Sequence, residues 1–204
     1  MNSKQGLTAR EITGTAILLA LVIVLQAFGG SITIGAVQLN FTLIPIVLGA
    51  VLFGKWSGLF LGFACGVVVL VQVIMGLAPF YAVIWTYTPV VAALTCIVKT
   101  SVAGFVAGLL YEWLVQKNGL VALFVASAVV PVVNTGLFIV GCLCMSESIS
   151  IFQSSIDMGG MNVFVFILVG LITFNFFIEL AINLLVSPAL HRVIGVVEKQ
   201  FKRK

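Results

Sequence analysis

The feature that most constrains this chain is a series of apolar runs, each about long enough to cross a lipid bilayer as a helix. Of the 204 residues, 62% are hydrophobic and only 8% are charged, whereas soluble domains contain about 25% charged residues. A membrane-crossing helix needs roughly 20 apolar residues. The sequence therefore predicts an all-α polytopic membrane protein, in which residues 1–204 form a single domain of six transmembrane helices.

The apolar runs are separated by short connections that carry polar or turn residues. The second run is short and contains Pro45, so we expect a tilted or broken helix there. We predict an extended loop or short hairpin at residues 31–40, and an aromatic loop, with or without a helical turn, at residues 76–89. The last span should end at Ser187-Pro188. The expected spans are Glu11–Phe28, Phe41–Phe53, Ser57–Met75, Val90–Val115, Leu120–Leu143 and Asn162–Val186.

The positions of lysine and arginine predict how these spans are oriented. Of the ten Lys and Arg residues, all but Lys99 fall at the chain ends or in the connections on the same side, such as those with Lys55 and Lys117. Basic residues in short connections mark the cytosolic side of a membrane protein. We therefore predict that the N- and C-termini are both cytosolic.

Lys99 is the exception, because it lies inside the fourth span. An ammonium at membrane depth costs roughly 2.5–3.5 kcal/mol on insertion scales, which makes such a residue a functional-site hypothesis. At 1.5 Å per residue, Lys99 lies about 27 Å from the cytosolic end of its helix, in the outer part of the membrane. This depth is compatible with a lysine that reaches the nearby interface, and equally with an outward-facing pocket that has a cationic wall.

Three polar residues of the last span, Asn175, Glu179 and Asn183, recur at every fourth position and so share one helix face. A carboxyl group near mid-membrane must be paired, protonated or hydrated. One interpretation is a buried tie from Glu179 to another helix, with Asn134 or Lys99 as its partner. The other is that this face lines a ligand site.

Other polar and aromatic residues would complete such a site. Asn134 follows Pro131, and irregular backbone within a membrane is tolerated where it lines a cavity. Pockets for small ligands are mostly apolar and aromatic, with a few placed polar groups. The candidate ligand-binding residues are Gln38, Asn40, Tyr81, Trp85, Tyr87, Lys99, Asn134, Asn175 and Glu179.

Other kinds of site find little support in the sequence. The single histidine, His191, lies in the basic tail, so we expect no catalytic residues, no metal site and no cofactor. No phosphate-binding loop occurs, so the chain is not expected to hydrolyse ATP itself. The net charge of +4 comes from the chain ends and connections, and does not indicate a nucleic-acid partner. The four cysteines are expected to pack as small apolar residues.

Glycines recur at every fourth position from Gly54 to Gly66, and again at Gly104 and Gly108. Small residues at this spacing let helix backbones approach closely in lipid. They predict a close-packing face, either inside the protein or towards a partner.

Three stretches carry a resemblance to a known family. The first is TAREITGTAILLAL, in which Ala16 and Ala20 form an AxxxA pattern on the first helix. The second is LNFTLIPIVLGAVLFGKWSGLFLG, and the third combines SVAGFVAGLLYEWL with PVVNTGLF of span five. With these stretches the chain resembles the substrate-binding S components of energy-coupling factor (ECF) vitamin transporters, over nearly its whole length.

The resemblance implies a set of partners and a location. Ala16 and Ala20 would pack against the membrane-embedded T component, with Gly14 extending that face. Two ATPase subunits would then drive substrate release on the inside of a bacterial cytoplasmic membrane. The resemblance also places the ligand on the outer side, enclosed by the first and third loops and spans four to six. The alternative for Ala16 and Ala20 is packing of span one within the chain.

The resemblance leaves the vitamin open. Lys99 favours a ligand with a carboxylate, which makes pantothenate the first candidate, and the stretch from Pro89 to Tyr111 is similar to pantothenate-type members. However, Thr88-Pro89 stands where an Asn-Pro pair is expected. Riboflavin, a pyridoxine-like vitamin and a queuosine precursor are the other candidates. The alternatives from other classes are a stand-alone secondary transporter or small channel and, with less support, a membrane-embedded enzyme or assembly factor.

Overall fold

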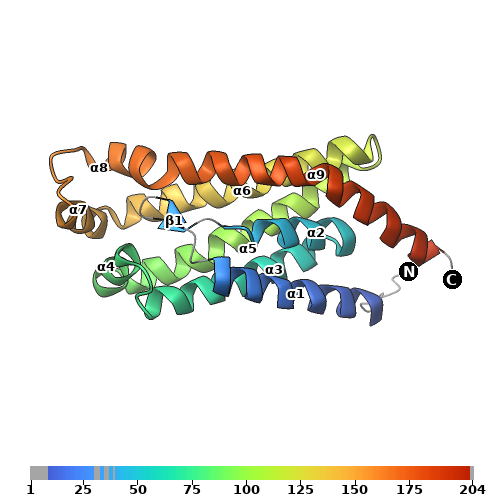
Figure 1. The fold of residues 1–204 in the computed structure, drawn as a ribbon, viewed down its shortest axis with the longest axis horizontal. Coiled ribbons are helices and arrows are strands. Elements are labelled where there is room, and N and C mark those ends of the chain that lie inside the picture. Colours follow the sequence, from blue (N-terminus) through green and yellow to red (C-terminus); the bar gives the residue numbers. More distant parts are fainter. Residues whose placement is uncertain (1–8, 30–32, 35–36, 39, 203–204) are drawn as a thin grey trace, which may run out of the picture.

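The computed structural model describes residues 9–29, 33–34, 37–38 and 40–202. Helices run along the long axis of an elongated bundle (Figure 1). The long helices are α1 (Ala9–Gly29), α3 (Lys55–Ile74), α5 (Pro89–Leu114), α6 (Gly119–Cys144) and α9 (Thr173–Lys202). The shorter elements are β1 (Thr33–Ile34), β2 (Val37–Gln38), α2 (Leu43–Phe53), α4 (Pro79–Tyr87), α7 (Ser146–Ser155), α8 (Val163–Val165) and the π-helix η1 (Phe166–Ile172).

Within the residues that the structure describes, five helical segments are long and apolar enough to cross a membrane, and α2 is a shorter apolar helix. The eleven residues of α2 extend about 16 Å at 1.5 Å per residue, roughly half of a 30 Å hydrocarbon core. These five helices overlap the first, third, fourth, fifth and sixth expected spans, and α2 overlaps the second, which was expected to be short. The start of α1 and the described end of α9 lie at the same end of the bundle (Figure 1).

The glycine-rich face of α3 packs directly on α5, so the predicted close packing is confirmed within the chain. A Cβ atom on Gly66 would lie 2.6 Å from the Cys96 carbonyl oxygen, and one on Gly58 would collide with the backbone of Gly104. The two helices are also joined by a hydrogen bond of 2.7 Å from Thr100 Oγ1 to the Gly62 carbonyl oxygen. This contact fixes the position of Lys99, which lies on α5 beside it.

Two predicted connections contain regular structure. The short hairpin expected at residues 31–40 is present as β1 and β2, which pair antiparallel with Thr33 opposite Gln38. The aromatic connection at residues 76–89, for which a helical turn was allowed, contains the nine-residue helix α4. Pro79 explains the helix, because a proline at the first helical position has its φ angle already set for a helix.

The prediction that the last span ends at Ser187-Pro188 is wrong, because α9 continues to Lys202. Pro188 cannot donate a backbone hydrogen bond, which bends a helix without necessarily ending it. Figure 1 shows the C-terminal part of α9 turning away from the bundle axis. Leu190 and Ile194 are buried beyond the proline, so packing stabilises the continued helix.

The cysteine prediction is correct for three of the four residues. Cys65, Cys96 and Cys142 are buried free thiols. Cys144 is exposed, because it lies at the last position of α6.

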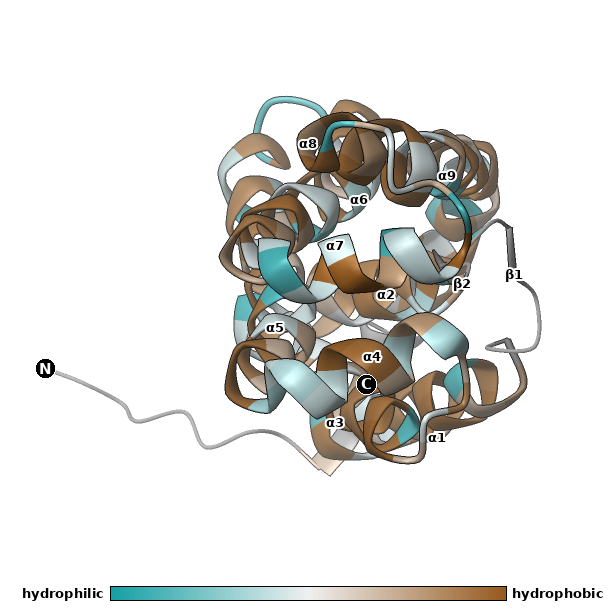
Figure 2. Ribbon diagram, turned by 90° about the vertical axis from the view of Figure 1, so that its left-hand side faces the viewer, coloured by the Kyte–Doolittle hydropathy of each residue, from teal (hydrophilic) through white to brown (hydrophobic). Residues whose placement is uncertain are grey.

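Helices α4 and α7 lie across the end of the bundle opposite to the described chain ends (Figure 2). Phe152 of α7 contacts Phe80 of α4, with ring centroids 5.3 Å apart, and Phe166 of η1, at 6.3 Å. The hydroxyl oxygens of Thr88 and Ser148 are 3.0 Å apart at the same place. These contacts form a cap over this end of the bundle.

Candidate ligand-binding site

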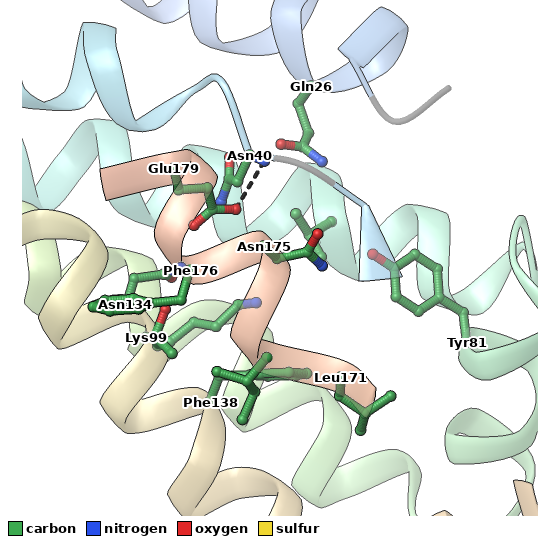
Figure 3. Close-up of a pocket in the computed structure, with 13 residues that line it drawn as sticks. Gln26, Asn40, Tyr81, Lys99, Asn134, Phe138, Leu171, Asn175, Phe176 and Glu179 are labelled. Carbon is green, nitrogen blue, oxygen red and sulfur yellow. Dashed lines mark hydrogen bonds between the residues drawn. The ribbon is translucent and has the colours of Figure 1, made fainter. Parts of the chain in front are cut away.

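A cavity with about 510 Å³ of space between atoms, its open mouth included, lies beneath the cap (Figure 3). Residues from α1, α3, α4, α5, α6, η1 and α9 contribute to its wall. The structure brings together six of the nine predicted ligand-binding residues here: Asn40, Tyr81, Lys99, Asn134, Asn175 and Glu179.

Lys99 reaches the cavity from α5 with a half-buried side chain. Its Nζ atom lies 4.6 Å from the centroid of the Phe138 ring, a cation–π contact worth roughly 0.5–2 kcal/mol. Among the described residues, no carboxylate oxygen lies within 4.0 Å of this ammonium. The aromatic ring stabilises the positive charge without neutralising it, so the cavity keeps a cationic wall.

Asn134 supplies an amide on α6 at the same wall. Its side chain is buried, and its Oδ1 atom has no hydrogen-bond partner in the part of the chain that the structure describes. A buried polar atom left in this state is uncommon and calls for an explanation such as a ligand. Asn175 is also buried and points into the cavity from α9 (Figure 3).

Glu179 ties the segment before α2 to α9. Its Oε1 atom accepts a hydrogen bond of 2.9 Å from the backbone N–H of Asn40. The buried tie predicted for this carboxyl group therefore exists, but its hydrogen-bond partner is Asn40 rather than Asn134 or Lys99. Asn183, the third member of the polar stripe, donates to the Glu179 carbonyl oxygen at 2.8 Å and does not line this cavity.

Gln26 of α1 lines the cavity and was missed as a site residue. Its amide donates to Gln72 Oε1, and the Gln72 amide donates to the Gln26 carbonyl oxygen, both at 3.0 Å. Thr42 donates to Gln26 Oε1 at 3.5 Å. The sequence did contain a signal, because Gln26 is the only polar side chain in the second half of the first span. Phe138 was also missed, and an aromatic residue in an apolar run gives no such signal.

The aromatic candidates on α4 separate into two groups. Tyr81 lines the cavity and is buried, and this burial raises the pKa of its phenol above the ordinary value, so the hydroxyl group stays neutral. Trp85 packs against the hydrophobic core and Tyr87 is 57% exposed, and neither lines the cavity. The structure therefore does not bring Trp85 and Tyr87 together with the other candidates, although all three aromatic residues belong to the same helix α4. For Gln38 only the backbone in β2 is described, and its side chain lies outside the described part.

The two alanines predicted to contact a partner lie on α1. Ala16 and Ala20 are both exposed, while α1 packs on the bundle through other residues such as Leu18 and Val22. Gly14 does not extend this face, because a Cβ atom there would collide with the ring of Phe53. Gly14 is therefore a packing residue within the chain.

A comparison with known protein families identifies the family of the chain. A family model described as "ECF transporter, substrate-specific component" matches residues 10–191, which include every residue that lines the cavity. No curated protein matches the sequence. Within the described residues, no group of three or more His, Cys, Asp or Glu side chains is arranged to hold a metal ion.

Proposed function

The chain belongs to the family of substrate-specific components of ECF transporters, and on this basis we propose that it captures a small anionic vitamin in the cavity beneath α4 and α7. The family places the chain among multi-pass membrane proteins that bind a substrate and are not themselves enzymes. Pantothenate is the first candidate for the substrate, ahead of riboflavin, a pyridoxine-like vitamin and a queuosine precursor.

The observation that carries the proposal is the ammonium of Lys99. The ammonium lies beside an aromatic ring, and no carboxylate oxygen of the described residues is within 4.0 Å of it, although Glu179 lines the same cavity. A positive charge in this setting is suited to the carboxylate of a ligand. Charge-assisted hydrogen bonds are the strongest that such a site can offer. The Asn134 amide oxygen and the Tyr81 hydroxyl would bind the neutral polar groups of the same ligand.

The proposal extends to the partners and the membrane. Family membership implies a T component and two ATPase subunits, and we assign the contact with the T component to Ala16 and Ala20. Both are exposed on α1 one helical turn apart, which leaves a shallow surface where another helix can approach closely. The distribution of Lys and Arg supports cytosolic chain ends in a bacterial cytoplasmic membrane, with the cavity opening towards the outside.

Mass spectrometry of small molecules that co-purify with the detergent-solubilised chain tests the proposal directly. We expect a stoichiometric, carboxylate-containing vitamin, with pantothenate tested first by titration of ligand-free protein. Recovery of only neutral or cationic molecules would contradict the assignment of Lys99. Gradient-driven uptake by the chain alone in liposomes, without an ATPase, would instead favour a secondary transporter.

A further inference from the structure

A second cavity adjoins the polar one. It lies between α3, α4, α5 and the end of α6, and the space between its atoms is about 350 Å³ when the open space at its mouth is included. Four residues line both cavities, namely Val69, Tyr81, Lys99 and Phe138. The residues that line only the second cavity are mostly apolar and include Val73, Phe80, Ile84, Ala92, Cys96 and Met145. We call this second cavity the apolar chamber.

The apolar chamber is suited to hydrocarbon rather than to water. Away from Lys99, Tyr81 and Thr95 its wall is apolar, so a water molecule in that part would find few hydrogen-bond partners. Its empty space also deprives the surrounding side chains of dispersion contacts. An apolar group that entered would restore these contacts, so the chamber favours an apolar occupant.

Lys99 lies at the junction of the two cavities. A group that binds its ammonium is therefore next to the chamber. The rest of the same molecule can extend past Phe138 and Tyr81 towards Ala92, which is only 1% exposed.

From this continuity we propose that the substrate has two parts, a carboxylate bound at Lys99 and a compact apolar end held in the apolar chamber. This inference rests on the proposed function, because it takes the anion site at Lys99 as given. It adds that the apolar end contributes to the affinity, and that α4 selects substrates by the size of this end.

The test uses four linear monocarboxylates, from propionate to hexanoate, titrated against the purified full-length chain. Each methylene transferred from water to an apolar environment contributes about 0.8 kcal/mol, or roughly fourfold in affinity. We expect the affinity of the wild-type protein to rise by about this factor per methylene. Ala92→Leu fills the chamber and should make the four affinities equal, and Ala92→Val, which adds less volume, should reduce the slope. Ala93→Leu is the matched control, because Ala93 lines neither cavity, and should keep the wild-type slope.

The possible results separate this inference from the function on which it rests. Equal affinities for all four acids in the wild-type protein would refute the chamber and leave the anion site intact. A slope that persists in Ala92→Leu would also refute the chamber. If none of the acids binds, the proposed anion site at Lys99 is refuted. The inference of a two-part substrate, which rests on that site, is then refuted as well. Titrations with the corresponding alcohols, which lack the charge, measure how much of the apparent affinity comes from partition into detergent, and this part is subtracted.

Discussion

Lys99 illustrates how a single residue can be retained inside a membrane protein at an energetic cost. Its ammonium faces the Phe138 ring at 4.6 Å, and this contact recovers only part of what the charge loses on leaving water. A carboxylate oxygen in direct contact would recover more, but none lies within 4.0 Å among the described residues. Under the proposed function, the bound anion would supply this contact.

Lys99→Met should reduce the affinity for pantothenate, or for the carboxylate that co-purifies, by about 10- to 150-fold. This range corresponds to the 1.5–3 kcal/mol of a hydrogen bond to a charged group. Isothermal titration of the detergent-purified protein measures the effect. Lys117→Met is the control, because Lys117 is exposed and lies over Trp113 in the connection between α5 and α6. Equal ligand affinities for Lys99→Met and the wild type would indicate that the Lys99 side chain only reaches the membrane–water interface and does not bind the ligand.

Asn134→Leu should separate ligand binding from stability. The Oδ1 atom of Asn134 has no partner among the described residues, so an apolar side chain of similar size removes an unsatisfied group. We expect the melting temperature of the ligand-free variant to be unchanged or higher, while ligand affinity falls about tenfold or more. A lower melting temperature with unchanged affinity would instead identify Asn134 as a structural residue.

At the scale of the elements, the contact between α3 and α5 holds the cavity in place. Neither helix can move away without losing the backbone contacts of Gly58, Gly62 and Gly66, and neither can come closer. Protein interiors transmit such constraints because they are close-packed.

Gly62→Ala should destabilise the protein by about 1–3 kcal/mol, the usual cost of overpacking. The added Cβ atom meets the backbone of Thr100 and Ser101, which cannot rotate away as a side chain would. Thermal unfolding in detergent measures the loss. Gly136→Ala serves as the control, since a Cβ atom there has nothing within 4 Å, and it should leave the melting temperature unchanged or raise it. Equal melting temperatures for the two variants would contradict the tight contact.

The sequence predicted the elements well where hydrophobicity alone decides them. The ends of α5 and α6 lie within one residue of the predicted spans, because runs of apolar residues in lipid must be helical to pair their backbone groups. The end of α9 was wrong because the burial of Leu190 and Ile194 outweighs the effect of Pro188. Such packing depends on residues distant in sequence, which a local pattern does not contain.

The candidate site was predicted to a similar extent. Polar residues inside apolar spans stand out, and this rule found Lys99, Asn134, Asn175 and Glu179. The rule cannot supply partners, which is why the hydrogen bond from Asn40 to Glu179 was not foreseen. It also cannot identify the apolar residues of a cavity wall, which are indistinguishable in sequence from those that face lipid.

For the whole molecule, the proposed ligand site and the proposed partner face lie on different surfaces. The cavity lies inside the bundle, whereas Ala16 and Ala20 lie on the exposed side of α1. Gln26 connects the two, because it belongs to α1 and also lines the cavity.

Ala16→Trp and Ala20→Trp should block assembly with the T component and leave ligand affinity within about twofold of the wild type. A large ring on this face prevents the close approach of another helix. Co-purification of the complex and titration of the isolated chain measure the two effects. Leu185→Trp adds a similar ring at a 78% exposed position on α9 and should assemble normally. If Ala16→Trp and Ala20→Trp both assembled normally, the assignment of this face of α1 to the T component would be refuted.

The short helix α2 has a consequence for the distance over which cargo must be moved. Asn40, which lines the cavity, lies three residues before Leu43, the first residue of α2. A molecule bound there would lie near the start of this helix, which is about 16 Å long. Under the proposed function, the ligand would reach this depth by diffusion, and the ATP-driven step would act on the part of the route that remains.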